Sequence, residues 1–140
     1  MRLAGVTDQA LYEKAKTICM EIGHLFQVQD DYLDCYGDPD RIGKIGTDIR
    51  DNKCGWLINT ALGICSDKQK KDLESNYARG TDKRAEAKVK AIFKELDLET
   101  HYRAHEDAAY AKIKAKIAEV EGMPSTIFTF LIEKINKRDK

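Results

Sequence analysis

The sequence predicts an all-α fold, and two observations support that prediction. Apolar residues recur three and four positions apart instead of alternating, which is the period of a helix with one buried face. The chain has only 2 prolines and 9 glycines, so few positions interrupt a helix. We therefore predict helix nearly throughout residues 1–140, folded as one domain without an internal repeat.

The first predicted helix is the longest. Its apolar stripe advances by four and three positions, through Leu11, Ala15, Ile18, Ile22 and Leu25 or Phe26. Gly37-Asp38-Pro39 ends the helix, because proline disfavours helical geometry in the residue before it and glycine weakens a helix. We expect a glycine-rich loop from residue 37 to residue 46.

A second helix is expected to begin at Thr47-Asp48. The side-chain oxygens of these two residues suit the free N–H groups of a helix start. The helix would carry Lys53 and Trp56 and end near Ile64, before the next start signal.

Four more helices complete the predicted order. Ser66 and Gln69 have the spacing of a capping box, so a helix should start there and run through Tyr77. Apolar stripes at helical spacing follow in three further segments: residues 82–96, residues from 97 to the Gly122-Met123-Pro124 stop, and residues 127–135. The whole chain then reads as a helical bundle.

Charge and hydropathy exclude several classes of function. Lys and Arg number 24 and Asp and Glu number 24, so no net charge attracts nucleic acid, and we expect no nucleic-acid partner. No apolar run approaches the roughly 20 residues that span a membrane, and residues 1–8 lack the apolar stretch of a secretion signal. We expect a cytoplasmic protein without a membrane span.

An acidic segment follows the apolar stripe of the first helix. Asp30 and Asp34 are four apart and share one helix face, while Asp31 lies about 100° around the axis. Carboxylates without His or Cys suit Mg²⁺, which shares its coordination sphere with substrate phosphates. Tyr32 occupies a position where a calcium hand needs an oxygen. An exposed acidic helix end, or a cap for the turn at Gly37, remains an alternative to the magnesium site.

The glycine-rich loop places a cation near the expected start of the second helix. Lys44 lies between Gly43 and Gly46 and precedes Thr47-Asp48. A cation next to a helix N-terminus suits a phosphate group. The spacing differs from that of a nucleotide-binding P-loop, since no glycine lies five positions before Gly43. A solvated loop lysine is the alternative reading of Lys44.

Three blocks of sequence follow one another: Phe26-Gln27-Val28-Gln29-Asp30-Asp31-Tyr32-Leu33-Asp34, Gly43-Lys44-Ile45-Gly46-Thr47-Asp48-Ile49 and Asp51-Asn52-Lys53-Cys54-Gly55-Trp56-Leu57. Together, in this order, they resemble the isoprenyl diphosphate synthase family, and within it the farnesyl diphosphate synthases of the eukaryotic type. The resemblance implies an isoprenoid synthase helical bundle, of which this chain would be the C-terminal part only, without the N-terminal half.

The resemblance also implies roles for individual residues. Asp30, Asp31 and Asp34 match the second aspartate-rich motif, which would bind Mg²⁺ as cofactor, with Asp30 as the principal ligand. The remaining matches are Lys44 on the allylic diphosphate, Asp48 and Lys53 in a supporting polar network, Phe26 and Gln27 along the cavity near the reacting carbons, and Arg138 closing over isopentenyl diphosphate. Lys44, Gln27 and Asp48 would be the residues nearest the chemistry.

The implied reaction is a prenyl transfer. Isopentenyl diphosphate would condense with dimethylallyl or geranyl diphosphate, the allylic substrate, to give farnesyl diphosphate. The first aspartate-rich motif of the family is absent from residues 1–140, so we expect this chain alone not to turn over. The alternative is an incomplete helical module that binds magnesium diphosphate or a full-length subunit without catalysis. A homodimer or association with a full-length synthase would fit either reading.

Overall fold

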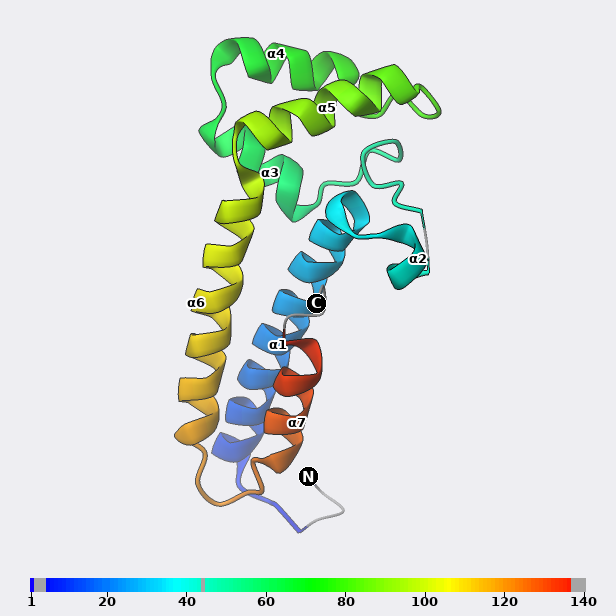
Figure 1. The fold of residues 1–140 in the computed structure, drawn as a ribbon. Helices are drawn as coiled ribbons and strands as arrows, with labels where there is room; N and C mark the ends of the chain where they lie inside the picture. The colour runs from blue at the N-terminus through cyan, green and yellow to red at the C-terminus, as the bar shows by residue number, and fades with distance from the viewer. Residues whose placement is uncertain (2–4, 44, 137–140) are drawn as a thin grey trace. The chain divides into compact units, whose positions relative to one another are not determined.

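The computed structural model describes residues 1, 5–43 and 45–136, and every regular element in these ranges is a helix (Figure 1). The helices are α1 (Gln9–Tyr36), α2 (Pro39–Ile42), α3 (Trp56–Ile64), α4 (Asp67–Asn76), α5 (Lys83–Glu95), α6 (Leu98–Ala118) and α7 (Thr126–Ile135). The prediction of an all-α fold is confirmed. Lys44 and Arg138, two predicted site residues, lie outside the described residues.

Helix α1 ends where the sequence predicted. The N–H of Gly37 donates to the carbonyl oxygen of Leu33 at 2.8 Å, which closes the last turn. A Cβ at position 37 would lie 2.6 Å from that same carbonyl oxygen, so the position requires glycine. The chain can therefore turn sharply at the end of the acidic segment.

Helix α2 was not predicted, since residues 37–46 were expected to form a loop. Asp38 caps this one-turn helix by accepting a hydrogen bond from the N–H of Asp40 at 3.0 Å. Pro39 occupies its first position, where a missing N–H costs nothing. Gly43, with φ of 73°, ends it in the left-handed conformation.

The predicted helix start at Thr47-Asp48 is wrong. The N–H groups of Arg50 and Asp51 both donate to the carbonyl oxygen of Thr47 at 2.9 Å, and Asn52 then adopts φ of 59°. A left-handed residue cannot continue an α-helix, so residues 48–52 form an isolated turn. Helix α3 begins only at Trp56.

The capping box before α4 is confirmed. The hydroxyl of Ser66 accepts from the N–H of Gln69 at 3.3 Å, and the Gln69 side chain accepts from the N–H of Ser66 at 3.0 Å. The next helix, α5, is capped by Asp82, which accepts from the N–H groups of Arg84 and Ala85. Local sequence signals thus fix both starts.

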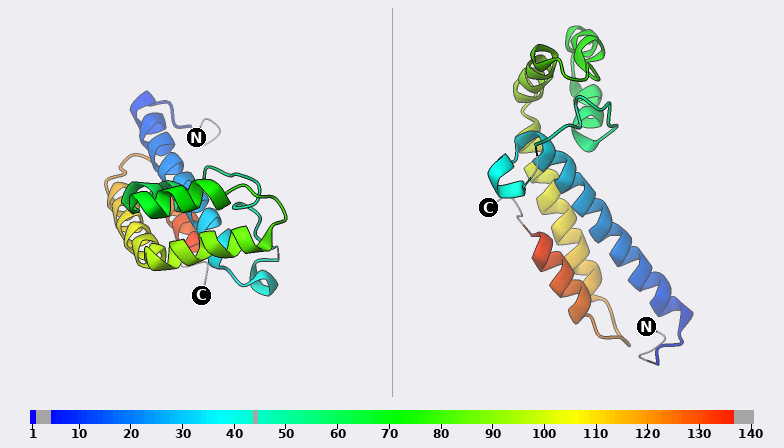
Figure 2. Two further views of the ribbon diagram at one scale, coloured as in Figure 1. Left: turned by 90° about the horizontal axis from the view of Figure 1, so that it is seen from above. Right: turned by 90° about the vertical axis from the view of Figure 1, so that its right-hand side faces the viewer.

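The described residues form two compact units. Unit 1 contains the first part of α1 up to Gln27, the second part of α6 from His105, and α7, which pack side by side (Figure 2). Its core consists of aliphatic and aromatic side chains from all three helices: Ala15, Ile18, Ile22, Leu25, Ile113, Ile117, Phe128, Ile132 and Ile135. These residues match the apolar stripes predicted from the sequence.

Unit 2 comprises residues 28–104. One core cluster joins the turn at Ile49 to α3, α4, α5 and the start of α6: Ile49, Leu57, Ile58, Ala61, Leu73, Val89, Ile92, Phe93 and Leu98. A second cluster groups Val28, Tyr32, Leu33 and Tyr102. The rings of Tyr32 and Tyr102 stack with centroids 3.8 Å apart. All the acidic residues singled out from the sequence fall in this unit.

Candidate functional site

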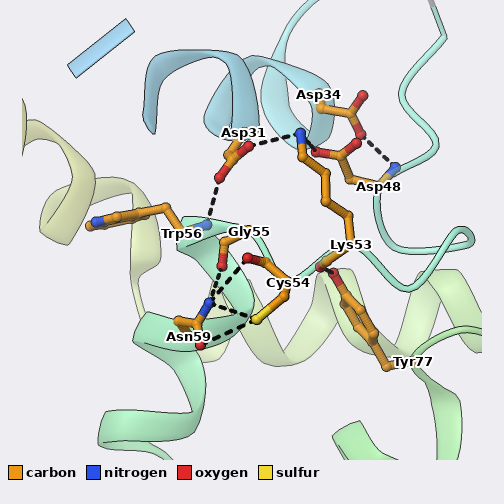
Figure 3. A network of polar contacts seen from close by, with 9 residues as sticks. All are labelled: Asp31, Asp34, Asp48, Lys53, Cys54, Gly55, Trp56, Asn59 and Tyr77. Carbon is orange, nitrogen blue, oxygen red and sulfur yellow. Dashed lines mark hydrogen bonds and ion pairs between the residues drawn. The ribbon is translucent and has the colours of Figure 1, made fainter. Parts of the chain in front are cut away.

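Asp31 is the most deeply buried carboxylate of the acidic segment, with 7% of the residue exposed. One of its oxygens accepts from the N–H of Trp56 at 2.6 Å, and the other lies 2.9 Å from the ammonium of Lys53 (Figure 3). The N-cap of α3 is Gly55, which has no side chain to satisfy the free N–H groups there. Asp31 supplies that cap from a distant helix, and its charge suits the positive end of α3.

Gly55 is required by this close approach. A Cβ at position 55 would lie 2.9 Å from an Asp31 carboxylate oxygen and 3.1 Å from the carboxylate carbon. Real side chains do not tolerate such contacts, so any larger residue would push Asp31 away from Trp56. The segment Cys54-Gly55-Trp56 therefore forms part of the site that receives the Asp31 side chain, and we call this segment the α3 socket.

Lys53 links two carboxylates of the site. Its ammonium lies 2.9 Å from Asp31 and donates to Asp48 at 2.7 Å. Burial acts to lower the pKa of Lys53, but the two carboxylates outweigh burial and hold that pKa above its ordinary value. Lys53 is therefore a permanent cation in this network.

Asp48 is a partly buried carboxylate next to Lys53 and Asp34. Burial raises its pKa above the ordinary value, Lys53 partly offsets this, and the negative charges of Asp34 and Asp31 raise it further. The N–H of Asp48 also donates to a carboxylate oxygen of Asp34 at 2.9 Å. Asp31, Asp34 and Asp48 are thus brought together by direct contacts, which their separation in sequence does not reveal.

The segment before Asp48 lies directly on the end of α1. A Cβ at Gly46 would be 1.7 Å from the carbonyl oxygen of Asp34 and 2.8 Å from its carboxylate. No side chain fits in that space. Gly46 therefore allows the loop and the acidic helix end to touch.

Two further residues support the network and were not singled out from the sequence. The hydroxyl of Tyr77 donates to the carbonyl oxygen of Lys53 at 2.7 Å, and burial raises the pKa of Tyr77 to about 12. The amide of Asn59 donates to the carbonyl oxygen of Gly55 at 2.8 Å. Tyr77 gives no sequence signal of this role, whereas Asn59 lies four positions after Gly55, a spacing that suits such a contact.

The other predicted residues of the described ranges are more exposed than Asp31. Asp30 and Asp34 are partly buried. Phe26 and Gln27 lie earlier in α1, within unit 1, and both are exposed, with 44% of Phe26 accessible. The structure brings together Asp31, Asp34, Asp48 and Lys53 in unit 2, while Phe26 and Gln27 belong to unit 1.

Comparison with known proteins shows the family of this chain. The family described as polyprenyl synthetase matches residues 1–96, which is more than half of the sequence. The chain belongs to the polyprenyl synthetase family. The acidic segment, the loop after it and the α3 socket all fall inside the matched residues.

Relatives of this chain include farnesyl pyrophosphate synthases. The chain is 45% identical to that of Saccharomyces cerevisiae over 143 aligned residues, covering 100% of this chain and 40% of the relative. It is 47% identical to that of Zea mays, covering 92% of this chain and 37% of the relative. The chain thus spans about two fifths of the length of these relatives, in their C-terminal portion.

Solved structures agree with the sequence comparison. A Trypanosoma brucei farnesyl diphosphate synthase complexed with the bisphosphonate BPH-722 aligns with a TM-score of 0.87 at 35% identity, covering 92% of this chain and 36% of that one. The synthase from the same organism complexed with risedronate gives a TM-score of 0.87 at 34% identity. The predicted isoprenoid synthase fold is therefore confirmed for this chain.

The donor chemistry of the site suits a hard cation, although no three metal-binding side chains are gathered at one point among the described residues. Both oxygens of Asp31 meet protein donors, so Asp31 is better placed to orient its neighbours than to bind a metal directly. Asp30 and Asp34 offer carboxylate oxygens at one helix face, which fits Mg²⁺.

None of the helices in the described ranges has the length and apolar character of a membrane span.

Proposed function

We propose that this chain is part of a prenyltransferase that makes farnesyl diphosphate. Its second aspartate-rich motif, Asp30, Asp31 and Asp34, would form one side of the magnesium-diphosphate site. The observation that carries the proposal is the contact network of Asp31, Lys53, Asp48 and Asp34 at the end of α1. Burial and, after it, the charge of Asp34 raise the pKa of Asp48 in this network, so an added cation is favoured there. Relatives named farnesyl pyrophosphate synthase supply the reaction class.

The residues of the site would have different roles. Asp30 and Asp34 would hold Mg²⁺, and Asp31 would fix their helix end against α3 through Trp56. When bound, Mg²⁺ would offset the charge of the allylic diphosphate and ease its departure. Lys53 keeps Asp31 and Asp48 in place and limits their mutual repulsion.

The other assigned residues keep their predicted roles in this proposal. Lys44 would contact the allylic diphosphate, and Arg138 would close over isopentenyl diphosphate. Phe26 and Gln27, both exposed on α1, would line the cavity near the reacting carbons. The cytoplasmic location, the single domain and the homodimer stay predictions.

A second candidate function is favoured by one specific observation: both carboxylate oxygens of Asp31 are engaged, one by the N–H of Trp56 and the other by Lys53. With one of the three acidic residues occupied in this way, the chain would bind magnesium diphosphate without catalysing prenyl transfer. The two candidates share the same binding site and differ only in turnover. We expect no farnesyl diphosphate from this chain alone with geranyl diphosphate, isopentenyl diphosphate and Mg²⁺; product formation would rule out the binding-only candidate.

Calorimetric titration with preformed magnesium diphosphate tests the shared site. We expect the Asp30→Asn variant to bind at least about tenfold more weakly, because it loses a metal-binding charge. The matched control is Asp107→Asn, an exposed position of α6 in unit 1, which should leave the affinity unchanged. Equal affinity of Asp30→Asn and the unsubstituted protein would remove the proposed site.

A further inference from the structure

Glu86 is a partly buried carboxylate that joins two elements of unit 2. Its side chain is 12% exposed and lies on α5. One oxygen accepts from the Nε of Arg50 at 2.7 Å, and the other lies 2.8 Å from the ammonium of Lys90 on the next turn of the same helix. Arg50 is 36 positions away in sequence, so this contact ties α5 to the turn at residues 48–52.

The turn that Arg50 belongs to also carries the site residues. The N–H of Arg50 donates to the carbonyl oxygen of Thr47, and the N–H of Lys53 donates to the carbonyl oxygen of Asp48 at 3.0 Å. Asp48 is two positions before Arg50, and Lys53 is three positions after it. A displacement of Arg50 would therefore move the Lys53 ammonium, which meets Asp31, and the Asp48 N–H, which donates to Asp34.

Other contacts hold the same turn from different sides. The carbonyl oxygen of Ile49 accepts from the N–H of Ala78 at 3.0 Å, and the Ile49 side chain is buried in the core of unit 2. The N–H of Asp48 is held by Asp34. These contacts hold the backbone before Arg50, and Tyr77 holds the carbonyl oxygen of Lys53 after it, whereas Glu86 holds the Arg50 side chain itself.

The Arg50–Glu86 contact is a charge-assisted hydrogen bond. Burial acts to raise the pKa of Glu86, but hydrogen bonds from Lys90 and Arg50 outweigh burial and hold that pKa below its ordinary value. The carboxylate is therefore ionised at neutral pH. Hydrogen bonds between ionised partners are shorter and stronger than neutral ones, so this one can restrain a turn.

We propose that Glu86 is a positioning residue for the diphosphate site, acting through Arg50 on the turn at residues 48–52. It would keep Asp48 and Lys53 against Asp31 without touching substrate or metal itself. The consequence for ligand binding rests on the proposed function, whereas the restraint on the turn does not. None of the roles assigned from the sequence extends to α5.

The test is a double-mutant cycle with magnesium diphosphate as the titrated probe. We expect Arg50→Ala and Glu86→Ala each to weaken binding about fivefold, and the double variant to bind no more weakly than either, because both remove one interaction. Glu86→Gln keeps an acceptor oxygen for Arg50 and should recover most of the affinity. Lys90→Ala is the control; it leaves the Arg50–Glu86 contact in place and should change affinity less than about twofold.

Amide hydrogen exchange separates positioning from general destabilisation. In Glu86→Ala, the amides of Arg50, Asp51 and Lys53 should exchange faster, while those in α5 keep their protection. Additive effects in the cycle, unchanged exchange in the turn, or equal acceleration throughout α5 would each overturn the proposal. If the unsubstituted protein binds no magnesium diphosphate, the proposed function fails, and exchange in the turn still decides whether Glu86 restrains it.

Discussion

The two units of this chain contain the same kind of helix but are stabilised in different ways. Unit 1 packs three helices along an apolar seam, with Lys112 and Lys116 pairing with Glu21 at its edge. Unit 2 combines apolar clusters with the buried carboxylate of Asp31 and a turn held by hydrogen bonds. Each unit buries a carboxylate, Glu106 in unit 1 and Asp31 in unit 2, and buried charge costs stability. In unit 2 this carboxylate meets Lys53 and the start of α3, so a polar network as well as apolar packing holds that unit together.

The comparison predicts that the stability of unit 2 is most sensitive to substitution at Gly46, where two backbone segments lie in contact. Gly46→Ala should lower the free energy of unfolding by about 4 kcal/mol, because its Cβ would lie 1.7 Å from the carbonyl oxygen of Asp34. Urea unfolding followed by circular dichroism measures this. Gly63→Ala is the control: it lies in α3 with open space around its Cβ, and alanine there should cost nothing or add up to about 1 kcal/mol. Similar effects at both positions would contradict the close approach.

The free energy of unfolding of unit 1 should instead fall when apolar volume is removed from its core. Ile113 is 1% exposed in its core, so Ile113→Ala should lower the free energy of unfolding by about 3 kcal/mol through the cavity it leaves. Ile127 on α7 is 55% exposed, and Ile127→Ala should cost less than about 1 kcal/mol. Denaturant titrations of both variants test the seam. A small effect at Ile113 would show that the apolar seam does not carry the stability of unit 1.

Disruption of the polar network of unit 2 should also lower the free energy of unfolding. Lys53→Met removes the ammonium that meets Asp31 and Asp48 and leaves a buried carboxylate without its cation. We expect about 2 kcal/mol of destabilisation, less than for a fully buried pair because the Lys53 side chain is 36% exposed. In Lys16→Ala the lost pair with Glu13 is exposed, and the change should be near zero. The unfolding midpoint of Lys53→Met in urea, compared with that of Lys16→Ala, decides between these values.

The smallest predicted effect depends on pH. Tyr77→Phe removes the hydrogen bond to the Lys53 carbonyl oxygen and should cost about 1 kcal/mol at pH 8. The pKa of Tyr77 is raised from 10.0 to about 12 by burial, so folding favours the protonated phenol, and this contribution is lost as pH rises from 10 towards 12. The two proteins should therefore have similar stability near pH 11. A gap that stays constant from pH 8 to pH 11 would contradict the burial of the phenol.

The network also explains which parts of the site could be predicted from sequence. Asp31 was assigned to the acidic motif because it lies beside Asp30 in a recognisable pattern. Its contact with Trp56 could not be predicted, since that contact depends on how α1 and α3 are placed in unit 2. The expected helix start at Thr47-Asp48 was wrong because Asn52, with φ of 59°, ends the turn after one round, and one carboxylate oxygen of Asp48 meets Lys53.

The sequence by itself determined the helices, most of their ends and the family pattern. Those features depend on residues three and four apart, on Gly37 and on the capping box at Ser66, all of which act locally. Tertiary structure alone decided that Asp31 caps α3, that Gly46 must lie on the end of α1, and that Glu86 reaches Arg50. These are contacts between residues 12 to 36 positions apart, and only the packing of helices against one another brings such residues within hydrogen-bonding distance.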